Sequence, residues 1–131
     1  MTKELIISII IVAIIVTGDI LTTKNTNKCI QETKERLLQM EQELQKNDDE
    51  IDGQNLKKQM ESILSDWRAK HRKLAMYIEH NELEKVETDL SSLNGYLKQE
   101  EYGDANAQID VSIYVLEHIK NKTTLSIINI F

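Results

Sequence analysis

Residues 5–16 read LIISIIIVAIIV, a run of seven isoleucines, two valines, one leucine, one alanine and one serine. None of these side chains is charged, and no other part of the chain resembles the run. A helix that is apolar all round suits lipid or a deep core, whereas a helix of a small soluble bundle keeps a polar stripe. The run therefore predicts a membrane segment.

The uncharged region can be extended to Leu21, with Asp19 as its one interruption. As a helix, residues 5–21 would span about 25 Å, slightly less than the roughly 30 Å hydrocarbon core. The span is sufficient if Asp19 lies at the far interface, where its carboxylate stays hydrated. We therefore expect a transmembrane anchor in residues 1–21. The side chains expected to face lipid are Leu5, Ile6, Ile7, Ile9, Ile10, Ile11, Val12, Ile14, Ile15 and Val16.

Two alternatives to an uncleaved anchor stay open. Lys3, the apolar run and the small residues near Gly18 also fit a cleaved signal peptide. A buried helix of a soluble core is the other alternative, although Ser8 is the only polar residue that it would offer. We favour the uncleaved anchor.

The flanking charges and the export-like start of the chain favour opposite orientations. Lys3 is the one basic side chain before the run, and four follow it: Lys24, Lys28, Lys34 and Arg36. The positive-inside rule therefore favours a cytoplasmic body. A short basic start followed at once by an apolar core is instead typical of exported proteins.

Residues 22–131 have the composition of one small helical domain. The chain contains no proline and four glycines, and Leu, Ile, Glu, Lys and Gln are its common residues. These side chains lose little freedom in a helix. The net charge of −6 disfavours nucleic acid as a partner. Cys29 is the single cysteine, which excludes an internal disulfide and leaves a packed thiol or a disulfide between two chains.

Apolar residues recur at helical spacing in four segments after the anchor, separated by polar turns. We expect helices over about 22–46, 54–79, 81–97 and 102–120, with Asn81 as the N-cap of the third and Glu84 completing its capping box. Short turns make consecutive helices antiparallel. The sequence therefore predicts an all-α fold: the anchor helix followed by an antiparallel bundle of three to four amphipathic helices, arranged as stacked helical hairpins.

Two further regions are candidates for binding. Trp67, His71 and Tyr77 lie on or near the stripe of the second segment, where they form part of the core or line a ligand pocket. The tail at 123–131 is apolar and ends the sequence, either covering a seam of the bundle or docking onto a partner or the membrane surface. Its candidate interaction residues are Ile127, Ile128, Ile130 and Phe131.

Metal and catalytic sites find little support in the sequence. The histidines are His71, His80 and His118, and they do not form a metal-binding motif. Glu79, His80 and Glu82 cluster in sequence, but a histidine at a helix corner is usually structural. We expect no metal, no cofactor and no enzymatic activity.

The layout of the chain resembles that of the bacterial DUF4363 family. The likeness rests on the isoleucine-rich start, Trp67, the corner at 77–82, the helix carrying Val86, Leu90, Leu93, Tyr96 and Leu97, and the end at 125–131. The resemblance implies a small single-span protein of a Gram-positive bacterium, with its body outside the cytoplasm. It transfers no catalytic residue.

We therefore expect a membrane-anchored helical interaction or scaffold module in the cell membrane. Its expected partners are the membrane and another membrane or envelope protein, with a homodimer as a further candidate. The alternative is a domain that senses or binds a small molecule in a pocket near Trp67.

Overall fold

The computed structural model describes the backbone of residues 1–130 and the side chains of residues 1–125. Over this range the chain forms four α-helices and one short 3-10 helix, which confirms the all-α class. The elements are α1 (Thr2–Leu44), η1 (Asp48–Glu50), α2 (Gly53–Leu74), α3 (His80–Lys98) and α4 (Tyr102–Ile130).

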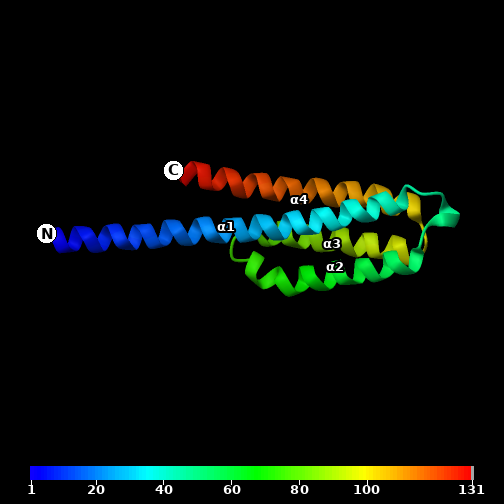
Figure 1. The fold of residues 1–131 in the computed structure, drawn as a ribbon, viewed down its shortest axis with the longest axis horizontal. Coiled ribbons are helices and arrows are strands. Elements are labelled where there is room, and N and C mark those ends of the chain that lie inside the picture. The colour runs from blue at the N-terminus through cyan, green and yellow to red at the C-terminus, as the bar shows by residue number, and fades with distance from the viewer. Residues whose placement is uncertain (131) are drawn as a thin grey trace.

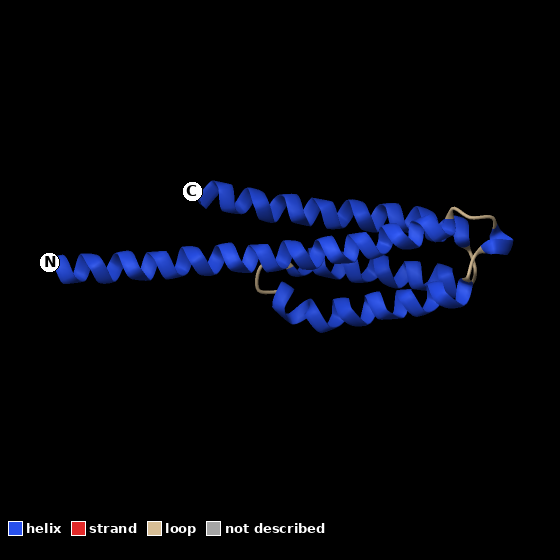
Figure 2. Cartoon of the chain, viewed as in Figure 1, coloured by secondary structure: helices blue, strands red, loops and turns tan. Residues whose placement is uncertain are grey.

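The four α-helices run up and down in an antiparallel bundle (Figures 1 and 2). Each helix packs on the helices that precede and follow it, and α4 returns to pack on α1. The connection between α1 and α2, which contains η1, lies at the same end of the bundle as the α3–α4 turn. The α2–α3 turn lies at the other end (Figure 1). The amino end of α1 and the carboxyl end of α4 both point away from the bundle at the α2–α3 end.

The core is built from one apolar stripe on each helix, as the spacing predicts. Leu37, Met60, Leu90 and Ile109 are fully buried, one from each helix. The remaining stripe members on α1 to α4 include Ile30, Met40, Leu56, Ile63, Trp67, Leu83, Val86, Leu93, Leu97, Ala105, Leu116 and Ile119. Because each stripe is used within the chain, the stripe of α1 is not free for a coiled coil with a second copy.

The apolar run of residues 5–21 and the first bundle helix form one unbroken helix. At about 1.5 Å per residue, the 43 residues of α1 extend for roughly 65 Å. The first buried residue of α1 is Thr26, and the apolar side chains before it are exposed except for the half-buried Val16. By length and composition α1 is able to cross a membrane. The segment from Thr2 is therefore not a helix buried in the bundle core.

The corner between α2 and α3 differs from the sequence expectation. α2 ends at Leu74 rather than near residue 79, because the backbone tightens into a turn that still buries Ile78. α3 begins at His80 with Glu79 at its N-cap, and no side chain caps it. The capping box predicted for Asn81 and Glu84 is therefore wrong: Glu84 Oε1 instead lies 3.0 Å from His80 Nε2.

Helix α4 is longer than expected. It continues through residues 121–130 instead of ending near Lys120, since nothing in this segment breaks a helix. Leu125 is exposed, so it does not cover a seam of the bundle. The side chains of Ile127, Ile128 and Ile130, together with all of Phe131, lie outside the described residues.

Local hydrogen bonds stabilise the α1–α2 and α3–α4 connections, at the end of the bundle opposite the α2–α3 turn. The Asp52 carboxylate accepts from the Asn55 N–H at 3.1 Å and caps α2. Glu100 closes α3 with φ of 60°, the left-handed conformation that usually selects glycine. The Glu101 N–H then donates to the Tyr96 carbonyl at 2.9 Å, which satisfies an end carbonyl of α3.

Candidate functional site

The end of α4 returns to the level at which α1 leaves the bundle. Lys120 Nζ donates to Gln31 Oε1 at 3.0 Å, which fixes the antiparallel register of these two helices. Ten residues beyond Lys120 is Ile130, and ten residues before Gln31 is Leu21. Both steps cover about 15 Å. The backbone of α4 therefore ends about level with Leu21, the last residue of the apolar segment.

The α2–α3 turn reaches nearly the same level. Lys70 Nζ lies 3.7 Å from Glu32 Oε2, which sets the register of α2 against α1. The turn follows a few residues later, and Tyr77 lines the same pocket as Thr22. We call this end of the molecule the base; it comprises residues 22–32, 70–82 and 119–130.

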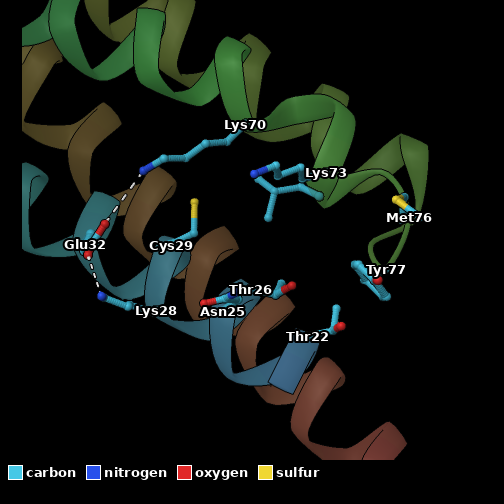
Figure 3. A pocket seen from close by; sticks show the side chains of 11 residues that line it. Thr22, Asn25, Thr26, Lys28, Cys29, Glu32, Lys70, Lys73, Met76 and Tyr77 are labelled. Atoms are coloured by element: carbon cyan, nitrogen blue, oxygen red, sulfur yellow. Dashed lines mark ion pairs between the residues drawn. The ribbon is translucent and has the colours of Figure 1, made fainter. Parts of the chain in front are cut away.

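An open pocket of about 440 Å³ lies at the base, between α1 and the end of α2 (Figure 3). It occurs where α1 and α2 meet over a short interface, since the part of α1 inside the bundle packs mainly on α4. Cys29 and Glu32 line it from α1, and Lys70, Lys73 and Tyr77 line it from the other side.

The Cys29 thiol lines this pocket but is only 8% exposed. Burial raises its pKa, an effect that the nearby Lys70 ammonium opposes and that Glu32 and Asp66 reinforce. A thiol held in its neutral form is a poor nucleophile. Its burial also places it poorly for a disulfide with a second chain.

The acidic groups of the base are paired with lysines. Glu32 lies 4.0 Å from Lys28 and 3.7 Å from Lys70. On the other side, Lys122 Nζ donates to Glu79 and to Glu82, each at 3.1 Å. These hydrogen bonds raise the pKa of Lys122.

Four basic side chains at the base form no ion pair among the described residues: Lys24, Arg72, Lys73 and Lys120, the last of which donates to Gln31 instead. Arg72 and Lys73 lie in the last turn of α2 and form no ion pair there. Lys73 borders the pocket, and in Figure 3 its ammonium points to the Cys29 side of the pocket, away from Met76 and Tyr77. The base therefore presents positive charge beyond what its own carboxylates neutralise.

Large apolar side chains are exposed beside this charge. Met76 is 73% exposed and Tyr77 is 48% exposed, both in the α2–α3 turn. Leu125 on α4 is exposed at about the level of Thr26, by the register described above. The base thus combines unpaired cations with exposed apolar groups.

The residues predicted for a pocket near Trp67 do not line one cavity together. Trp67 is 1% exposed and belongs to the core, and its indole N–H has no partner among the described side chains. His71 is half-buried, and its ring stacks edge-on against His80 at 6.1 Å. Tyr77 alone of the three lines the pocket at the base. Among the described residues, no three metal-binding side chains gather.

A second exposed apolar feature lies on α4, away from the base. Val111 and Tyr114 are exposed one turn apart, and Tyr114 is 71% exposed. This outer face of α4 is a candidate surface for a partner protein.

The pocket and its lysines are what sequence reasoning missed. The signal was present in the basic last turn of α2, followed at once by Met76 and Tyr77. These residues form part of a site only because α2 ends at the level where α1 leaves the bundle. The spacing of apolar residues along the sequence does not predict that level.

A family model described as a domain of unknown function (DUF4363) matches residues 20–130. The match begins before Thr26, the first buried residue of α1, so it includes the whole bundle. No curated protein and no solved structure matches the chain.

Proposed function

The chain belongs to the DUF4363 family, and from this premise we propose that it is a membrane-anchored helical module that binds or supports another membrane or envelope protein. The proposal is non-enzymatic. One observation carries it: α1 runs without a break from an exposed apolar segment into the bundle core.

The continuity of α1 supports a short, stiff tether. A bundle joined to lipid by a flexible linker would sample many heights above the membrane. Here no loop separates Leu21 from Thr26, so the bundle is held directly at the surface. Such a device suits the positioning of a partner close to the membrane.

We propose that the bundle lies outside the cytoplasm and that the anchor stays uncleaved. The short basic start before the apolar run supports export. The basic residues after the run instead favour a bundle in the cytoplasm. An exposed cysteine in place of Asp49, in a Cys29→Ser background, tests the orientation. A membrane-impermeant maleimide should label it in intact cells, and labelling only after lysis would contradict an outside bundle.

We assign the protein contact to the outer face of α4, where Val111 and Tyr114 are exposed. Single aromatic side chains beside aliphatic ones are common at contact centres. This surface is on α4 and leaves the bundle core unchanged, so substitutions there can be made without unfolding the domain.

Photo-crosslinking in cells tests the partner. A photoreactive amino acid at Tyr114 should form a discrete adduct with a membrane or envelope protein identified by mass spectrometry. The matched control places it at Lys58, an exposed position on α2. An adduct of twice the chain's 15.2 kDa would indicate a homodimer instead. No adduct at Val111 or Tyr114, with the protein present in the membrane, would contradict the assigned surface.

A further inference from the structure

We propose that the base of the bundle is a lipid-binding surface that sits on an anionic membrane. The α2–α3 turn places Met76 and Tyr77 in the interfacial layer, and Lys73 and Arg72 contact lipid phosphates. This inference rests on the proposed anchor and adds a second contact with the same membrane.

The position of the base follows from the register of the helices. Thr22 comes directly after the apolar segment and shares a pocket with Tyr77. The backbone of α4 ends about level with Leu21, as the Lys120–Gln31 hydrogen bond shows. The headgroup layer on each side of a bilayer is roughly 5–7 Å thick. With Asp19 at the edge of the hydrocarbon, Thr22 lies about 5 Å beyond that edge, so the α2–α3 turn and the end of α4 reach this layer.

The apolar side chains of the base suit that layer. Residues 5–21 are about 5 Å short of the hydrocarbon thickness, and a short span draws the flanking parts of a protein toward the bilayer. Met76 and Tyr77 are the large apolar side chains that the α2–α3 turn exposes at this level. A tyrosine is well suited to the interface, since its ring is apolar and its hydroxyl stays hydrated.

The charges of the base suit anionic headgroups. Its carboxylates Glu32, Glu79 and Glu82 are paired with lysines, whereas Arg72 and Lys73 form no ion pair among the described side chains. The opposite end of the bundle carries unlike charge: Asp48, Asp49, Glu50 and Asp52 near η1, and Glu100, Glu101 and Asp104 at the α3–α4 turn. An anionic surface would therefore attract the base and repel the far end.

Lipid, rather than a protein, is the occupant that these observations favour. The base lies where the anchor itself delivers it, at the membrane surface, and both its apolar and its basic groups match that surface. A protein that covered the base would need no anionic lipid and would leave the base exposed in pure lipid vesicles. The test below separates these outcomes.

The test uses the full chain in vesicles that contain spin-labelled lipids. A Cys29→Ser background receives a single cysteine at Met76, labelled with an environment-sensitive fluorophore. Matched labels at Ala13, in the middle of the anchor, and at Asp49, at the far end, serve as controls. In vesicles of phosphatidylcholine with about 30% phosphatidylglycerol, the Met76 label should be quenched by spin labels at headgroup depth, and the Asp49 label should not.

Substitution of one lysine tests the role of charge. Lys73→Gln should lower the ratio of docked to undocked bases about fivefold, the factor expected for one lysine near an anionic surface. Lys58→Gln changes the same charge on the same helix toward the far end and should have no effect. Vesicles of phosphatidylcholine alone should weaken docking of the unsubstituted base and remove the difference between the two variants.

The outcomes separate this inference from the anchor on which it rests. Quenching at Ala13 without quenching at Met76 would overturn the lipid-binding base and leave the anchor intact. No quenching at Ala13 would overturn both. Quenching at Met76 that is equal in neutral and anionic vesicles, with Lys73→Gln silent, would overturn the assignment of Lys73 and Arg72 to lipid phosphates.

Discussion

At the scale of single residues, burial decides the chemistry of Cys29. Its thiol lines a pocket, yet it is 8% exposed, and burial is the largest influence that raises its pKa. The sequence alone left open a thiol that crosslinks two anchored chains. The packing of α1 on its neighbours removes that thiol from solvent and keeps it protonated.

We predict that native Cys29 reacts slowly with iodoacetamide. At pH 8 the rate should be at least about tenfold lower than in 8 M urea, because the folded protein holds little thiolate and hides it. The raised pKa also makes the free energy of unfolding depend on pH. The thiol of the unfolded chain ionises at a lower pH than that of the folded chain, so the folded state loses stability as the pH rises through the pKa of the unfolded thiol. Alkylation followed by mass spectrometry measures the rate. Equal rates in buffer and urea would show that the thiol is free.

Trp67 provides a second prediction at this scale. Because its side chain is fully buried, Trp67→Ala should lower the free energy of unfolding by about 3–5 kcal/mol. Trp67→Phe should cost less, since it keeps most of the apolar volume. Urea unfolding followed by circular dichroism measures both variants. A nearly neutral Trp67→Ala would place the indole in an open cavity, as the alternative of a ligand pocket near Trp67 requires.

At the scale of elements, the end of α3 carries a residue that its backbone disfavours. Glu100 has φ of 60°, and glycine adopts this conformation without a steric penalty. Glu100→Gly should therefore raise the free energy of unfolding by about 0.5–1 kcal/mol. The neighbouring Gln99 has φ of −88°, so Gln99→Gly should instead destabilise by a similar amount. Opposite signs for the two variants, in the same urea experiment, support the left-handed turn.

The sequence predicts the helices better than it predicts their ends. Amphipathic spacing identified the stripes because burial on one face leaves a pattern along the chain. It failed at Asn81, where a capping box fits the pattern but α3 already begins at His80. The spacing also does not predict the left-handed conformation of Glu100, because a glutamate does not signal a positive φ. These details depend on how the neighbouring helices pack, which local spacing does not contain.

At the scale of the molecule, the base is the part that no segment of sequence predicts alone. Residues from α1, α2 and α4 meet there, although Thr22 and Tyr77 lie far apart in the chain. Their meeting follows from the common register of the helices and from the unbroken length of α1. The same length joins the apolar run to the bundle without a loop, which is the geometry that the proposed tether requires.

If α1 holds the bundle at the membrane as one intact helix, the apolar run must stay attached to the mature protein. Carbonate washing of the cell membranes, followed by intact mass spectrometry of the native protein, decides this. We predict that the protein stays in the membrane pellet at the full mass of about 15.2 kDa. A shorter chain that begins after Gly18 and is found in the soluble fraction would show that the apolar run is a cleaved signal, and would contradict the account.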